Sequence, residues 1–212
     1  MGYLVGGCAL SDLDCPFDIS RQVAIDFMHA AEGIIMRLFV LFAGNRVANM
    51  ARGFQEQKVH AHNAEINRHL KEWKLTQPQR DEVDRRWAAV QLPNGYGTKY
   101  VPFASGSTFT SADWFHLMVY AGRWIMDGIL TGSKLDIWLR LCRVFEALSQ
   151  NSVVNDPLIN QALLTFVAET VALCEKLLPK TEITMKMHNL IHLVEAIVDL
   201  GPTHGYWLFR CV

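Results

Sequence analysis

Asp26 and His29 are the two residues of this sequence whose types and spacing most clearly suit chemistry. Asp26 lies near the end of an apolar stretch, residues 22–28, which has the β-branched and aromatic composition of a short buried strand. A carboxylate is costly to bury there unless it binds a metal, accepts hydrogen bonds or pairs with a charge. Alternatively, Asp26 caps the helix that follows. The residues alone support both interpretations equally.

His188 and His192 form a second pair with chemical potential. Their spacing places both imidazoles on one helix face, one turn apart, where they could bind zinc if a third ligand came from elsewhere. Asn189 follows His188, so the glutamate of the metalloprotease motif is absent. The pattern therefore favours packed or hydrogen-bonded histidines over metal ligands.

The segment 45–99 carries a local positive charge, with ten Lys and Arg against six Asp and Glu. Such an excess marks the best candidate for a nucleic-acid surface. The residues proposed for it are His60, His62, His69, Trp73, Arg85 and Arg86. Because the excess is modest, an ordinary solvated helix face is the favoured alternative.

Bulk properties narrow the class of protein. The chain has 212 residues, a formal net charge of −1 and 50% hydrophobic residues, so it should fold, and its overall charge gives no reason to bind polyanions. Its five cysteines show no C-x-x-C spacing, which predicts reduced thiols. The N-terminus does not resemble a signal peptide, and the apolar run 34–43 is too short to span a membrane. We expect a nuclear or cytoplasmic protein that is neither secreted nor bound to a membrane.

The predicted elements make the fold mainly α. After the strand at 22–28, a helix is expected from His29 to Gly44. Another is expected over 63–73, with Ile66, Leu70 and Trp73 at helical spacing under a polar, basic face. The sequence at 76–79 predicts a capping box that opens a helix ending near Gln91, with Asp81 paired to Arg85 and Glu82 paired to Arg86. A long loop at 92–109 follows.

The second half has clearer helix boundaries. Capping patterns at 110–113 and 133–136 predict two helices, with Gly128 and Gly132 between them. Asp156 followed by proline predicts the start of a third helix, whose apolar stripe runs from Ile159 to Leu178. A last helix is expected from Glu182 to Leu200 and should end at the Gly-Pro pair 201–202.

Three separated stretches also carry motifs that belong together. The first contains Phe17-Asp18-Ile19, then residues 25–29 (Ile-Asp-Phe-Met-His), then residues 33–38 (Gly-Ile-Ile-Met-Arg-Leu). The second is the acidic-Trp pair Asp113-Trp114 within residues 110–120. The third is His-x-x-x-His-Leu at 188–193, then Gly-Pro at 201–202 and Tyr-Trp at 206–207. In this order, the three stretches resemble the catalytic region of CACTA-type DNA transposases, from about residue 14 to residue 209.

The resemblance implies an RNase H-like catalytic core interrupted by a large helical insertion. In that family three carboxylates hold two divalent ions, Mg²⁺ or Mn²⁺, which activate the nucleophile and stabilise the leaving oxygen during phosphodiester cleavage and strand transfer. The resemblance implies that Asp26 corresponds to the second catalytic aspartate, which is a metal ligand. It also implies that His29 corresponds to the histidine that accompanies this aspartate. The implied partner is transposon DNA, and a homo-oligomer is an open option.

The other two catalytic carboxylates depart from the family pattern. The first would precede Met1, and the position of the final glutamate is taken by Val212 or lies beyond it. We therefore expect a transposase-derived fragment that binds no metal stably and does not cleave DNA by itself. Its expected organisation is one mostly helical unit, with a core remnant at 1–28, a helical region at 29–200 and a truncated catalytic segment at 201–212.

Two further expectations follow. If the resemblance holds, Asp26 should lie near residues 201–212, because a separation above roughly 15 Å exceeds what a two-metal site can span. The alternative function is a helical protein-interaction module with no nucleic-acid role, in which Asp26 is only a helix cap.

Overall fold

Helices make up the regular structure of the described residues. The computed structural model describes residues 26–43, 68, 71–91, 111–150 and 156–203. Across these ranges every regular element is a helix and no strand occurs, which confirms the predicted mainly α class. The elements are α2 (Phe27–Ala43), α4 (Gln77–Ala88), α5 (Ser111–His116), the π-helix η3 (Leu117–Ala121), α6 (Gly122–Met126), α7 (Gly132–Leu148), α8 (Pro157–Leu177), the 3₁₀-helix η4 (Lys180–Glu182) and α9 (Met185–Leu200).

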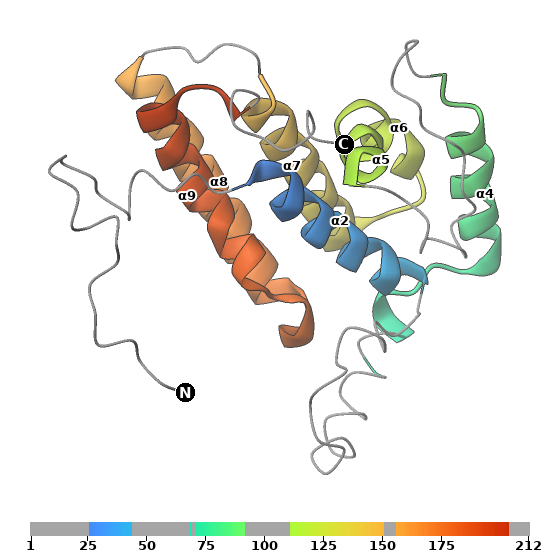
Figure 1. Ribbon diagram of the computed structural model, residues 1–212. Coiled ribbons are helices and arrows are strands. Elements are labelled where there is room, and N and C mark those ends of the chain that lie inside the picture. Colours follow the sequence, from blue (N-terminus) through green and yellow to red (C-terminus); the bar gives the residue numbers. More distant parts are fainter. Residues whose placement is uncertain (1–25, 44–67, 69–70, 92–110, 151–155, 204–212) are drawn as a thin grey trace, which may run out of the picture.

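Helix α2 lies in the middle of the bundle. Figure 1 shows α8 and α9 on one side of it and α5 and α6 on the other, with α4 at the outer edge beyond α6. Helices α8 and α9 form an antiparallel hairpin closed by η4, and α7 packs against α8. The two sides of α2 therefore face different partners, α5 and α7 on one side and α9 on the other.

Aromatic side chains join α2 to α5 and α7. The ring centroid of Phe39 lies 5.1 Å from that of Trp114 and 5.6 Å from that of Trp138. Phe27 lies 5.7 Å from Phe115 in an edge-to-face arrangement. All five rings are nearly or fully buried. Aromatic pairs of this kind each add about 0.5–1.5 kcal/mol beyond their buried area, so this cluster fixes α2 in the bundle.

A π-helical turn interrupts the passage from α5 to α6. The turn, η3, is followed by Gly122, whose carbonyl oxygen accepts a 2.8 Å hydrogen bond from the Nε1–H of Trp138. The buried indole N–H thereby finds the partner it needs. A Cβ at Gly122 would lie 3.1–3.2 Å from Cys142, Leu117 and Trp138, so the close packing of α6 on α7 depends on glycine there.

Several predicted helix boundaries are confirmed. The Thr76 N–H donates to Gln79 Oε1 at 2.9 Å, as in a capping box, and Asp156 accepts the Leu158 N–H at 2.8 Å. Gly201 ends α9 at φ 85°. Gly128 and Gly132, at φ 69° and 57°, separate α6 from α7 as expected. Left-handed backbone conformations of this kind strongly favour glycine.

The predicted strand at 22–28 is wrong where it can be checked. Residues 22–25 lie outside the described ranges, while Phe27 and Met28 form the first turn of α2. The Asp26 side chain accepts the Met28 N–H, and the helix buries Phe27 completely, so the apolar composition reflects a buried helix start. The expected remnant of an RNase H-like sheet is thus not seen in the described residues.

Smaller corrections concern helix starts and ion pairs. Helix α7 begins at Gly132, with Thr131 rather than Ser133 at the N-cap. Helix α9 begins at Met185, after η4, instead of at Glu182. Asp81 accepts a hydrogen bond from Gln77 rather than pairing with Arg85. These differences arise where several neighbouring polar residues compete for the same cap or partner.

Helix α8 is mostly apolar yet lies at the surface. By length and composition it could cross a membrane, and 22% of its most apolar stretch is buried in the bundle. Core helices of soluble proteins meet the same two criteria. Val167 and Val171 are buried as predicted, but Ile159 is 49% exposed, because only the second half of the helix packs closely on its neighbours.

Candidate functional site

The Asp26 carboxylate caps helix α2. Its Oδ1 accepts the Met28 N–H at 3.2 Å, and its Oδ2 accepts the His29 N–H at 3.3 Å. The same Oδ2 forms an ion pair with Nδ1 of the exposed His29 ring. The structure thus brings the two predicted site residues together and gives Asp26 the cap role that the sequence left open. A carboxylate has about four lone-pair sites, so Oδ1 keeps capacity for a further ligand.

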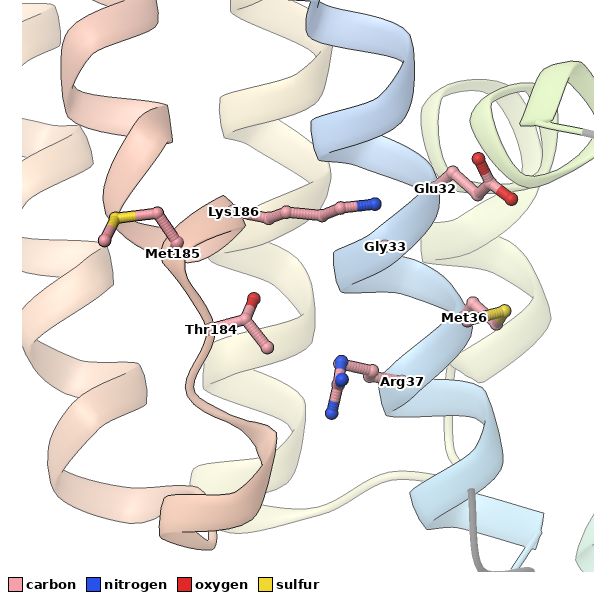
Figure 2. Close-up of a pocket in the computed structure, with 7 residues that line it drawn as sticks. All are labelled: Glu32, Gly33, Met36, Arg37, Thr184, Met185 and Lys186. Atoms are coloured by element: carbon pink, nitrogen blue, oxygen red, sulfur yellow. The ribbon is translucent and has the colours of Figure 1, made fainter. Parts of the chain in front are cut away.

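A small cavity lies one turn further along α2, where α9 begins. The cavity volume is about 200 Å³. We call it the junction pocket, and Figure 2 shows the residues that line it: Glu32, Gly33, Met36, Arg37, Thr184, Met185 and Lys186. The pocket lies between the first family-like stretch, which contains Gly33 and Arg37, and Thr184 and Lys186, which precede the third stretch.

Gly33 allows Lys186 to cross helix α2. A Cβ at Gly33 would lie 2.2 Å from Lys186 Cδ and 2.6 Å from its Nζ, so the lysine stem rests directly on the helix backbone. Figure 2 shows the Lys186 side chain extended from α9 across α2 at this point. Further along, Arg37 approaches Glu182 to 3.7 Å. Gly33 comes before Arg37 in the sequence, whereas its partner Lys186 comes after Glu182, the partner of Arg37. The chain therefore runs in opposite directions through α2 and through the start of α9.

The junction pocket mixes charges of both signs. Lys186, Arg37 and Glu32 line it, Glu182 lies beside it as the ion-pair partner of Arg37, and the N-terminus of α9 is at its edge. The Thr184 hydroxyl oxygen is buried and finds no hydrogen-bond partner among the described residues. The pocket can therefore hold a small polar group, but its near balance of charge gives no strong preference for an anion or a cation.

The two histidines of α9 contact each other directly. His192 Nε2 lies 3.2 Å from His188 Nε2, and the ring centroids are 4.9 Å apart. His192 Nδ1 lies 2.7 Å from Glu195 Oε2. Both rings are exposed on the outer face of α9. The predicted hydrogen-bonded arrangement is confirmed, and Glu195 is a partner that the sequence analysis did not name, although its i+3 spacing from His192 could have identified it.

Two members of the predicted basic surface are committed to other contacts. Trp73 is 3% exposed and stacks on Phe42 with centroids 6.3 Å apart, so its ring is not available to a nucleic-acid base. The Arg86 guanidinium donates to the carbonyl oxygens of Trp124, Ile125 and Asp127 at 2.6–3.2 Å. Arg86 therefore satisfies the C-terminal carbonyls of α6, where a cation also complements the helix dipole.

Arg85 remains exposed but is paired. It donates two hydrogen bonds of 2.7 Å to Glu82, and hydrogen bonds from Arg85 and Arg86 lower the pKa of Glu82 to about 2. Of the other residues proposed for the basic surface, His60, His62 and His69 lie outside the described ranges. Within residues 45–99 the structure also describes three other exposed cations, Arg68, Lys71 and Lys74.

Buried titratable groups do not add a catalytic centre. Burial raises the pKa of Cys142 and of Cys174 to about 12, so both free thiols stay protonated at neutral pH and are poor nucleophiles. Burial also lowers the pKa of His116, an effect that the negative charge of Asp113 opposes. The predicted reduced state is thus seen for the two cysteines in the described ranges.

The described residues do not fit a two-metal carboxylate site by themselves. Among the described residues, the transposase resemblance assigns only Asp26 to metal binding. No group of three or more His, Cys, Asp or Glu side chains in these ranges is placed to hold an ion. Residues 204–212, toward which Asp26 was expected to lie, are outside the described ranges. No catalytic step through a metal is therefore derived.

Comparison of the chain with protein-family models, with curated proteins and with solved structures found no match.

Proposed function

We propose that this chain derives from a CACTA-type DNA transposase and that its helical region serves DNA transposition by holding DNA rather than by cutting it. The observation that supports this most is that the three family-like stretches meet on helix α2. The first stretch includes α2, the second lies on α5 and the third begins on α9, and both α5 and α9 contact α2.

Specific contacts join these stretches. Trp114 of the acidic-Trp pair packs on Phe39 with centroids 5.1 Å apart. Lys186, just before the histidine motif, lies across Gly33, the glycine of the first motif. We take these contacts as support for one ancestral unit.

We propose a different set of cations for the contact with DNA. Arg68, Lys71 and Lys74 are exposed at helical or near-helical spacing, whereas Arg86 is held by α6 and Trp73 is buried. Lys134 of α7 adds a positive charge beside them, since its Nζ lies 5.7 Å from the Trp73 ring centroid. Lysine and arginine on one surface bind phosphates with little regard to base sequence.

Salt-dependent DNA binding tests the proposal. We expect the full chain to retain a fluorescent DNA duplex in anisotropy measurements at about 50 mM salt. The affinity should fall as salt rises, with a slope of about −0.9 per phosphate contacted. Replacing Arg68, Lys71 and Lys74 together by glutamine should weaken binding and lower that slope by up to about 3 units.

Lys176 and Lys180 provide the matched control. Both are exposed lysines, on α8 and η4 and outside residues 68–74, so Lys176→Gln with Lys180→Gln should leave DNA binding almost unchanged. Absence of DNA retention even at low salt would contradict the proposal. Equal losses in the control and in the triple variant would contradict the assignment of the surface.

The second candidate function is a helical protein-interaction module with no nucleic-acid role. Two observations favour it: Asp26 acts as a helix cap, and α8 exposes apolar side chains, with Leu158 81% exposed. Exposed apolar patches often mark contact sites for other proteins. A chain that folds but binds no DNA in the experiment above would support this function.

A further inference from the structure

The outer face of α9 carries a pair of histidines arranged like the ligands of a transition metal. The two Nε2 atoms lie 3.2 Å apart. In a tetrahedral zinc site with Zn–N bonds of 2.0–2.1 Å, two ligand nitrogens are separated by about 3.3 Å. A single ion could therefore bind both nitrogens with little movement of either ring.

Glu195 orients one of these rings for metal binding. Its Oε2 lies 2.7 Å from His192 Nδ1, which assigns the ring proton to Nδ1 and leaves the lone pair on Nε2, facing His188. A carboxylate bound to the far nitrogen of a ligating histidine is the usual outer partner in zinc sites, where it fixes the tautomer and raises the basicity of the ligand.

We propose that His188 and His192 form a two-histidine binding site for a divalent transition metal such as Zn²⁺, Ni²⁺ or Cu²⁺, with Glu195 as its orienting partner. Imidazole suits these ions, whereas Mg²⁺ and Ca²⁺ prefer oxygen ligands. Without metal, the His188 Nε2–H donates to the lone pair of His192. Binding of the ion would require the His188 proton to lie on Nδ1, so that each ring offers its Nε2 lone pair.

The helix beneath the pair is rigidly held. Leu190, Leu193 and Val194 are almost completely buried against the bundle, so the backbone that carries both histidines is ordered before any ion arrives. Preorganisation of this kind lowers the cost of binding. The rings themselves are exposed, so water completes the coordination sphere, and two protein ligands bind an ion more weakly than a closed four-ligand site.

Zinc titration of the full chain tests the site. After treatment with a chelator, calorimetric titration with zinc alone should show a binding event that His188→Gln or His192→Gln each weakens at least about tenfold. The double variant should bind zinc no more tightly than either single variant, because it lacks both imidazole ligands. Glu195→Gln should weaken binding about tenfold by loosening the His192 ring.

Asp199 supplies a control on the same helix. It is an exposed carboxylate of α9 and is assigned no role in the proposed site. Asp199→Asn should leave zinc affinity unchanged. Zinc binding that is equal in the wild type and in both His188 and His192 variants, or absent from the wild type, would overturn the proposal. Circular dichroism of each variant checks that the helices remain folded, and DNA binding is not required by any of these outcomes.

Discussion

The two sides of helix α2 present different kinds of side chain to the neighbouring helices. Toward α5 and α7 it presents phenylalanine rings that interlock with Trp114 and Trp138. Toward α9 it presents Gly33 and Arg37, which meet long charged side chains around a cavity of about 200 Å³. One helix thus has a tightly packed aromatic side and a loosely filled polar side.

The two sides of α2 should therefore respond differently to substitution. Aromatic rings that interlock have few alternative positions, so a change there leaves a cavity or causes a clash. A lysine lying over a glycine has several rotamers and can move aside at little cost. We therefore expect the aromatic side to determine the free energy of unfolding and the polar side to tolerate substitution.

Trp138→Ala should have the largest effect. Trp138 is fully buried between Phe39 and Phe42, and its Nε1–H bonds to the Gly122 carbonyl. Loss of a buried tryptophan lowers the free energy of unfolding by about 3–5 kcal/mol, which chemical denaturation would measure. Trp124→Ala is the control, because Trp124 is 50% exposed and should lose far less. Equal losses in the two variants would show that the aromatic side is not the stabilising one.

Asp26→Ala should have an intermediate effect at the start of α2. It removes the carboxylate that accepts the Met28 and His29 amides, a change that typically costs about 1 kcal/mol. Asp26→Asn keeps an oxygen that can cap the helix and should stay close to the wild type in the same denaturation experiment. If the asparagine variant were as unstable as the alanine variant, the ion pair with His29 would be the important contact instead of the cap.

Gly33→Ala should have the smallest effect and the opposite sign. Only the flexible end of Lys186 occupies the space of the new methyl group, and alanine is favoured over glycine inside a helix by about 0.5–1 kcal/mol. Gly122→Ala is its counterpart on the aromatic side, where the new methyl group would lie 3.2 Å from the Leu117 carbonyl oxygen and from Trp138, so these neighbours must shift. A Gly33→Ala variant that melts well below the wild type would contradict the view that the α9 side is adaptable.

Local signals explain what the sequence predicted correctly. The capping box at Thr76, the Asp156 cap and the turn glycines Gly128, Gly132 and Gly201 depend on a few adjacent residues, and each lies where it was expected. The mainly α class follows from such boundaries together with helical spacing of apolar residues. The Asp26 cap was one of two interpretations that the same local information supported.

Tertiary partners explain what the sequence missed. Arg86 was assigned to a basic surface because of its charge, but its guanidinium is used by carbonyls at the end of α6, about 40 residues away in the sequence. Trp73 was assigned to the same surface, but it is buried on Phe42. Neither contact can be predicted from the local sequence, because the partner lies on a distant helix whose position depends on the whole fold.

The distribution of tryptophans makes the bundle easy to observe in solution. Trp73, Trp87, Trp114 and Trp138 are at most 5% exposed, whereas Trp124 is half exposed. Intrinsic fluorescence of the described residues should therefore contain a blue-shifted majority and one red-shifted emitter within reach of a soluble quencher. Removing Trp124 together with Trp207, which lies outside the described residues, would leave an emission signal that reports on the interior of the bundle.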